Sequence, residues 1–228
     1  MSDRSFTTKE FEINESGNNP AIPSIYGDFQ PVLEDVAALL LGRIVSYSRD
    51  SKKEQNSKPY EHLSYRIKSE ESMRAKCAKL GLDATTANAL SSIRDAIGVR
   101  VVCLFIDDIY ENIEQIRHFK GCKVVDEKDY ILQSKPNGYR SYHLILNVTE
   151  LLNELVLPEG SFRPECLYAE IQLRTIAMDT WAALEHEMKY KKDIPHPELI
   201  SQELKRCADE LASCDVSMQT LRDLIRGS

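Results

Sequence analysis

An apolar run from Val99 to Ile106, interrupted only by Arg100, restricts the fold of this chain more than any other segment. A continuous run of this length is typical of a central strand with both faces covered. Further along, apolar and polar residues alternate from Leu167 to Arg174, which predicts a half-buried strand. Amphipathic helical segments separate such strands, so we expect an α/β (α+β) fold in which helices flank a mixed sheet.

Local patterns predict the remaining elements. Helices are expected at about 31–47, 69–80, 84–94, 107–120 and 175–191, strands at 122–126, 129–133 and 141–148, an extended stretch at 59–68, and loops at 49–58 and 149–165. Ser69 is a good N-cap for the second of these helices. Asp107 or Asp108 is expected to cap the fourth.

The chain is expected to divide into three parts. Residues 1–24 are polar and predict a flexible extension, residues 25–195 a folded domain, and residues 196–228 a long C-terminal helix. In that helix apolar residues recur at alternating four- and three-residue steps, as in an a/d seam: Ile200, Leu204, Cys207, Leu211, Cys214, Met218, Leu221 and Ile225. The seam has two interpretations, because the helix either packs on its own domain or joins copies of the chain.

Composition narrows the class of protein. The 228 residues carry a net charge of −7, which argues against bulk electrostatic binding to nucleic acid or to an anionic membrane but leaves room for a local basic cleft. We see no apolar run long enough for a membrane span and no signal-peptide core. The six cysteines form no CxxC pair. We therefore expect a cytoplasmic protein with reduced thiols.

Basic residues gather where the extended stretch 59–68 meets the following helix. Arg66 and Lys68 are alternate residues and share one side of the stretch. Ser72 and Lys76 are four apart and share one face of the helix. The free N–H groups and the dipole of a helix N-terminus favour anions. This segment is a candidate phosphate site, with a solvated basic face as the alternative.

Two carboxylates are candidates for a metal site or for acid–base chemistry. Asp95 stands just before the apolar strand and is placed to bind a divalent ion, or else to act as a turn or cap residue. Glu170 shares the polar face of its strand with Gln172 and Arg174. A carboxylate in such a row suits metal ligation or general-base catalysis, while a polar ladder on the surface is the alternative.

The segment Lys135-Pro-Asn-Gly-Tyr-Arg-Ser-Tyr-His143 is a candidate nucleotide-binding loop. Its Pro-Asn-Gly turn permits close approach of the backbone to a ligand. Tyr139 offers a ring on which a base can stack. Lys135, Arg140 and His143 can bind phosphates. An ordinary hairpin turn is the alternative, since Asn-Gly is common there.

Six motifs then occur in one order: Tyr65-Arg-Ile-Lys-Ser69, Asp95-Ala-Ile-Gly-Val-Arg-Val-Val102, Asp107-Asp-Ile-Tyr110, Lys135-Pro-Asn-Gly-Tyr-Arg-Ser-Tyr-His143, Glu170-Ile-Gln-Leu-Arg-Thr175 and Trp181-Ala-Ala-Leu-Glu-His186. Together they resemble the synthetase domain of the RelA/SpoT family, and above all its single-domain members, the small alarmone synthetases. The resemblance extends over roughly residues 25–225. The sequence has no Walker A loop, no Rossmann glycine triplet and no His-Asp dipeptide of a metal-dependent phosphohydrolase.

The resemblance implies a reaction and a fold. The family transfers the β,γ-pyrophosphate of ATP to the ribose 3′-hydroxyl of GDP or GTP, which yields ppGpp or pppGpp in the stringent response. It also implies a nucleotidyltransferase-like mixed sheet, with residues 25–195 as the synthetase domain, and Mg²⁺ as cofactor. Members of this size are often homotetramers, which would suit the seam in residues 196–228.

The resemblance also implies roles for residues. Asp95 would bind magnesium, and Glu170 would be a second ligand or the base for the 3′-hydroxyl. The residues expected to bind ATP are Arg66, Lys68, Ser72, Lys76 and Arg100. Those expected to bind GDP or GTP are Lys135, Asn137, Tyr139, His143, Gln172 and Asp179.

Two alternatives to this function remain at the level of sequence. In the first, the acceptor differs and is an adenine nucleotide or the 3′ end of tRNA. In the second, the protein is a non-catalytic nucleotide-binding regulator that uses its C-terminal helix for interaction. For Asp179 itself, a surface role is the alternative to a contact with the guanine edge.

Overall fold

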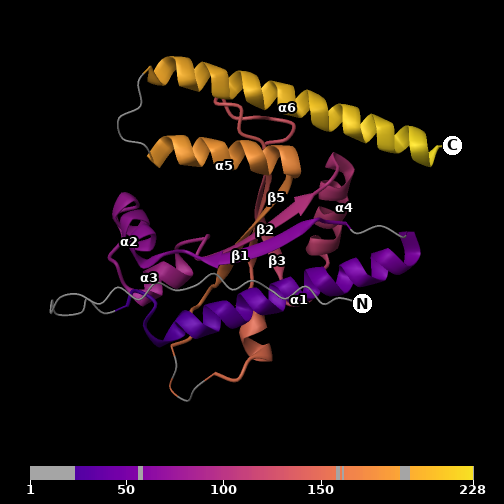
Figure 1. Cartoon of the computed structure of the whole chain (residues 1–228). Helices are drawn as coiled ribbons and strands as arrows, with labels where there is room; N and C mark the ends of the chain where they lie inside the picture. The colour runs from indigo at the N-terminus through magenta and orange to yellow at the C-terminus, as the bar shows by residue number, and fades with distance from the viewer. Residues whose placement is uncertain (1–23, 56–58, 158–159, 161, 191–195, 228) are drawn as a thin grey trace, which may run out of the picture.

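The computed structural model describes residues 24–55, 59–157, 160, 162–190 and 196–227, and its centre is a mixed sheet (Figure 1). The strands are β1 (His62–Ile67), β2 (Ile97–Cys103), β3 (Lys123–Asp129), β4 (Tyr142–Asn147) and β5 (Tyr168–Thr175). Their order is β1-β2-β5-β4-β3, in which β2 and β5 run parallel and all other neighbours are antiparallel. The predicted mixed sheet is thereby confirmed.

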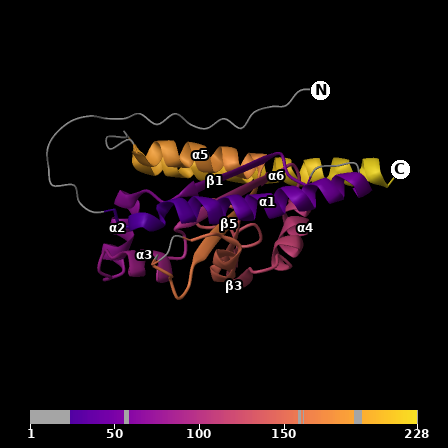
Figure 2. The same ribbon diagram turned by 90° about the horizontal axis from the view of Figure 1, so that it is seen from below.

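Helices lie on both sides of this sheet. They are η1 (Gly27–Phe29), α1 (Gln30–Gln55), α2 (Glu70–Lys79), α3 (Thr86–Ser91), α4 (Ile106–Arg117), η2 (Thr149–Glu154), α5 (Ile176–Tyr190) and α6 (Pro197–Arg226). Figure 1 shows α1 below the sheet and the α5–α6 pair above it, and the view from below places α1 in front of the sheet (Figure 2). Within the described segments, none of the helices has the length and apolar character needed to cross a membrane.

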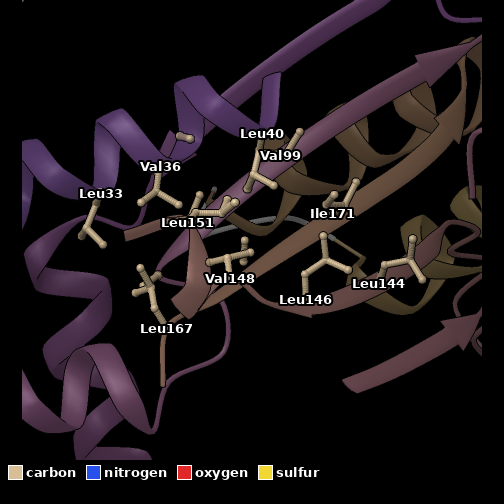
Figure 3. Packing of buried hydrophobic residues seen from close by; sticks show 14 of the residues in the cluster. Leu33, Val36, Leu40, Val99, Leu144, Leu146, Val148, Leu151, Leu167 and Ile171 are labelled. Atoms are coloured by element: carbon tan, nitrogen blue, oxygen red, sulfur yellow. The ribbon is translucent and has the colours of Figure 1, made fainter. Parts of the chain in front are cut away.

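Strand alternation decides which face of the sheet is the core and which carries polar groups. Apolar side chains of α1, among them Leu33, Val36 and Leu40, pack against apolar side chains of the central strands (Figure 3), which include Val99, Leu144, Leu146 and Ile171. Residues between them on β2 and β5 must point to the opposite face. These include Arg100, Glu170 and Gln172, and in the register of β2 and β5 Arg100 lies opposite Gln172. The polar row is thus on the side of the sheet occupied by α5 and α6.

Three of the predicted segments differ from the structure. The expected loop at 149–165 begins with the helix η2. The expected loop at 49–58 is helical as far as Gln55, because Arg49–Gln55 contains no proline or glycine to end α1; residues 56–58 lie outside the described part. In place of two strands at 122–126 and 129–133 there is one strand, β3. Asp129 ends it, since its Oδ1 accepts hydrogen bonds from the N–H groups of Ile131 and Leu132, at 2.8 and 2.9 Å.

The predicted caps have different outcomes. Ser69 is the N-cap of α2, and its side chain accepts a hydrogen bond from the N–H of Ser72. Neither aspartate caps α4, which begins at Ile106 without a side-chain cap. Asp108 is instead buried and forms an ion pair with Arg222 of α6, with 2.5 Å between oxygen and nitrogen.

The C-terminal helix is confirmed, and its seam is used in two ways. The first half, Ile200 to Leu211, is partly buried, and α6 packs on α5. In the second half Met218, Leu221 and Ile225 are 44%, 60% and 76% exposed. The fully buried positions of α6 are Ala208, Asp215 and Arg222, seven residues apart. The seam therefore packs on its own domain only in part, and an apolar row is left exposed beyond Leu211.

Candidate active site

Two pockets open on the polar face of the sheet and meet at one carboxylate. The β2 pocket, of about 180 Å³, is lined by Ser64, Tyr65, Arg66, Asp95, Gly98, Val99, Arg100, Glu170 and Gln172. The β4 pocket, of about 230 Å³, is lined by Asp126, Glu127, Lys128, Tyr130, Lys135, His143, Ile145 and Glu170. Glu170 lines both, because β5 lies between β2 and β4 in the sheet.

At the edge of the β2 pocket, Asp95 holds the two lysines that were predicted to bind phosphates. The ammonium groups of Lys68 and Lys76 lie 3.0 and 2.8 Å from its Oδ2. Arg66 lines the same pocket and lies along Gly98 of β2, where a Cβ atom would be 3.5 Å from its Cγ. Ser72 is in the first turn of α2 and is exposed, and its hydroxyl accepts a hydrogen bond from Ser69.

The other oxygen of Asp95 fits a cation. Asp95 Oδ1 is buried and has no hydrogen-bond partner within the described segments. Over the same part of the chain, no group of three or more His, Cys, Asp or Glu side chains could hold a metal alone. Mg²⁺ commonly binds through one or two carboxylates while substrate phosphates and water complete its coordination. Asp95 and Glu170, which both line the β2 pocket, suit an ion of this kind.

Arg100 and Asp179, predicted to bind different nucleotides, form an ion pair. Arg100 Nη1 lies 3.2 Å from Asp179 Oδ1, and Arg174 Nη1 lies 3.0 Å from the same oxygen. Burial and the nearby charge of Arg174 lower the pKa of Arg100, whereas Asp179 raises it. The carboxylate of Asp179 thus joins Arg100 of the β2 pocket to Arg174 of β5.

Arg174 is a site residue that the sequence-based assignment left out. It is 5% exposed and also donates hydrogen bonds to Tyr139 Oη, at 2.8 Å, and to Gln172 Oε1, at 3.0 Å. The alternation of the sequence did indicate Arg174, because this residue shares the polar face of β5 with Glu170 and Gln172. Lys128 and Tyr130 of the β4 pocket were missed as well, because the segment around them was expected to break between two strands.

A chain of hydrogen bonds leads from the loop to Glu170. Tyr139 Oη lies 2.7 Å from His143 Nε2, and His143 Nδ1 lies 3.0 Å from Glu170 Oε1. Gln172 donates to the other carboxylate oxygen, at 2.8 Å. Burial raises the pKa of Glu170, but the hydrogen bonds from His143 and Gln172, together with the charges of His143 and Lys76, outweigh it and lower the pKa to about 2. Glu170 is therefore ionised at neutral pH.

Replacing His143 by asparagine should raise the pKa of Glu170 from about 2 toward its ordinary value of 4.5, because the hydrogen bond from the imidazole is lost. The titration of the Glu170 carboxyl carbon by ¹³C NMR would measure this. His118→Asn is the matched control, since that ring contacts the carbonyl of Glu114 instead. A pKa of Glu170 that stays near 2 in His143→Asn would contradict the assignment.

The loop residues are arranged around aromatic rings. Lys135 Nζ lies 4.6 Å from the ring centre of Tyr130 and 4.7 Å from that of Tyr139. Asn137 organises the turn, since its Oδ1 accepts from the Tyr139 N–H and its Nδ2 donates to Glu185. Tyr139 makes an edge contact with Tyr130, at 6.0 Å between ring centres. The loop thus brings one cation and two rings together beside the β4 pocket.

A family model described as a region found in RelA / SpoT proteins matches residues 65–195. The chain belongs to the RelA/SpoT family. The matched region begins in β1 and ends before α6, so it contains β2, β4 and β5 and all the residues that line the two pockets except Ser64. In this RelA/SpoT protein the polar face of the sheet is accordingly part of the segment that defines the family.

Two curated relatives come from Bacillus subtilis (strain 168). The chain is 42% identical to the GTP pyrophosphokinase YwaC over 151 residues, which is 66% of this chain and 68% of the relative. It is 32% identical to the GTP pyrophosphokinase YjbM over 169 residues, covering 74% of this chain and 75% of the relative. Both relatives are thus matched over more than two thirds of their length.

Solved structures of the same organism have the same fold. Small alarmone synthetase 1 bound to its product pppGpp superposes with a TM-score of 0.70 and 28% identity, over 86% of this chain and 95% of that one. Small alarmone synthetase 2 gives a TM-score of 0.64 and 35% identity, over 82% and 96%. The resemblance inferred from six short motifs is therefore confirmed by sequence and by fold.

Proposed function

We propose that this protein transfers the β,γ-pyrophosphate of ATP to the 3′-hydroxyl of GDP or GTP and so produces ppGpp or pppGpp. The observation that carries the proposal is the position of Glu170, a buried and ionised carboxylate that lines two pockets. Transfer between two nucleotides requires such an arrangement, because donor and acceptor must meet at one point. Relatives named GTP pyrophosphokinase and a similar structure bound to pppGpp support the same reaction.

ATP would occupy the β2 pocket. Arg66 and Arg100 line it and present guanidinium groups to the adenine. Lys68 and Lys76, now paired with Asp95, would bind the phosphates, with Ser72 at the N-terminus of α2. Mg²⁺ held by Asp95 and Glu170 would neutralise charge on the transferred group. The buried Oδ1 of Asp95 supports this assignment.

The acceptor nucleotide would occupy the β4 pocket. Lys135 and His143 would bind its phosphates, and Tyr139 would stack on guanine once Lys135 leaves the ring for a phosphate. Gln172 and Asn137 would keep Glu170 and the loop in place. Asp179 would accept hydrogen bonds from the edge of the base. Lys128 and Tyr130 line this pocket as well, and we add them to the acceptor site.

In the chemical step, the acceptor 3′-oxygen forms a bond to the β-phosphorus of ATP. The bond between that phosphorus and the oxygen bridging to the α-phosphate breaks, and AMP leaves. Phosphoryl-type transfer depends mainly on positioning and on charge neutralisation. A carboxylate with a pKa of about 2 is a weak base, so Glu170 would hold the hydroxyl proton only in passing and release it to water or to the phosphate of the leaving AMP.

An acceptor assay tests the proposal. Purified protein is incubated with ATP labelled in the γ-phosphate, Mg²⁺ and, separately, GDP, GTP, ADP and deacylated tRNA. We expect labelled ppGpp and pppGpp with the guanine nucleotides and AMP in equal amount. Transfer of the label only to ADP, or only to tRNA, would indicate a different acceptor. Failure to transfer to any acceptor, with nucleotide binding intact, would indicate a regulator.

We further propose that the protein acts in the cytoplasm during the stringent response, with residues 25–195 as the synthetase domain. Residues 191–195, and 1–23 of the proposed N-terminal extension, lie outside the described segments. The assembly would be a homotetramer that covers the exposed apolar row of α6, made of Cys214, Met218, Leu221 and Ile225. Such rows on a soluble surface commonly mark interfaces.

Substituting Leu221 by glutamate should reduce the mass of the assembly, because a charge would enter the apolar row. Multi-angle light scattering of the wild-type protein should show a tetramer or dimer, and Leu221→Glu a smaller species. Ser213→Glu adds the same charge at another exposed position of α6 and should leave the mass unchanged. A wild-type protein that runs as a single chain at micromolar concentration would refute the assembly.

A further inference from the structure

The loop of residues 135–140, called the acceptor loop below, lies directly against α6. Gly138 has a φ of +92°, and a Cβ atom at this position would lie 2.5 Å from Ala208 Cβ and 3.5 Å from Lys205 Cα. The backbone of the loop therefore touches the backbone and the smallest side chain of the helix. Only glycine on one side and a small residue on the other permit this approach.

A polar contact beside Gly138 fixes the loop in the same place. Arg140 donates to Asp209 Oδ1, at 3.3 Å. Asp209 also accepts from Lys205 one turn earlier, at 2.7 Å, which orients its carboxylate. Ala208 and Asp209 are adjacent in α6, so one short segment of the helix meets two residues of the loop.

Two hydrogen bonds hold α6 itself to the site. Trp181 of α5 donates from Nε1 to the carbonyl of Leu204, at 2.7 Å. Thr175, at the end of β5, donates to Asp215, at 2.7 Å. Trp181 is 2% exposed and makes an edge contact with Tyr139, at 6.3 Å between ring centres. The position of α6 is thus tied to β5 and α5, which carry Glu170 and Asp179.

We infer that α6 is a positioning element of the acceptor site, in which Ala208 and Asp209 set the conformation of the acceptor loop and thereby the affinity for the acceptor nucleotide. The inference rests on the proposed function. The inference goes beyond the proposed function because α6 lies outside the family match, which ends at residue 195. The residues assigned to ATP come from β1, the turn that follows it, α2 and β2, whereas α6 packs on α5 and α4. A change in α6 should therefore alter the affinity for the acceptor nucleotide and leave the affinity for ATP unchanged.

Enzyme kinetics can separate this role from a general one. In Ala208→Leu the KM for GDP should rise about tenfold, because displacing a binding group by about 1 Å can lower the reaction rate up to 10²-fold. In Asp209→Asn the KM for GDP should rise less. The KM for ATP should change less than about twofold. Glu210→Gln is the control, since Glu210 pairs with Arg206 rather than with the loop. Asp209→Glu should restore part of the acceptor affinity.

Hydrogen exchange gives a readout that needs no catalysis. The amides of Lys135 and Gly138 bond to Tyr139 O and Lys135 O, at 3.1 and 2.8 Å. They should exchange faster in Ala208→Leu while the amides of β5 do not. The inference would be overturned if the two loop amides exchanged at the same rate in Ala208→Leu as in the wild type. It would also be overturned if the KM values for ATP and GDP rose together and Tm fell. A wild-type protein that makes no product would refute the proposed function instead, and exchange would still decide on α6.

Discussion

Replacing Glu170 by glutamine should lower the rate of pyrophosphate transfer about 10³-fold, within the usual range for loss of an acid–base group. Glutamine has nearly the same shape, so the packing of β5 is kept, but it has no negative charge and cannot accept the hydroxyl proton. Affinity for ATP and GDP should stay the same or rise, because a carboxylate between two sets of phosphates is removed. Single-turnover transfer from labelled ATP to GDP measures the rate, and calorimetry measures the affinities.

The control for this variant is Glu150→Gln, which removes the same charge from an exposed residue of η2. That variant should transfer at the wild-type rate. If Glu170→Gln retained more than about a tenth of the wild-type rate, Glu170 would be neither the base nor a necessary metal ligand. The meeting of two pockets at this residue would then be incidental.

The parts of the site that follow from local periodicity could be predicted from sequence. Alternation along β5 placed Glu170 and Gln172 on the polar face, and both line the β2 pocket. The Ser69 cap fixed the start of α2 and so the positions of Lys68 and Lys76, whose ammonium groups both reach Asp95. Each of these inferences used only residues within one element or at its end.

Pairings between distant elements could not be predicted. The ion pair of Arg100 with Asp179 joins β2 to α5, and no periodicity within either element specifies its partner. The same holds for α6, where the heptad pattern pointed to apolar contacts. The buried positions are instead Asp215 and Arg222, which bind Thr175 and Asp108, and the small Ala208, which meets Gly138. Charge partners and close backbone contacts depend on tertiary geometry that the local pattern does not contain.

Replacing Asp95 by asparagine should abolish transfer to a similar extent, but for a different reason and with a different signature. The unpartnered Oδ1 would no longer be an anionic metal ligand, and Lys68 and Lys76 would be released from their ion pairs with Asp95. Two free ammonium groups should bind the phosphates of ATP at least as tightly as before. We therefore expect kcat to fall about 10³-fold while the Kd of a non-hydrolysable ATP analogue is unchanged or lower.

Magnesium dependence distinguishes this role from a purely structural one. Residual transfer by Asp95→Asn should require a higher Mg²⁺ concentration for half-maximal rate, whereas Asp83→Asn, an exposed aspartate before α3, should leave the titration unchanged. If the affinity for the ATP analogue fell in parallel with kcat, Asp95 would serve to hold Lys68 and Lys76 in place instead of binding the metal. The buried, unpartnered Oδ1 favours the metal, since positioning the lysines uses only Oδ2.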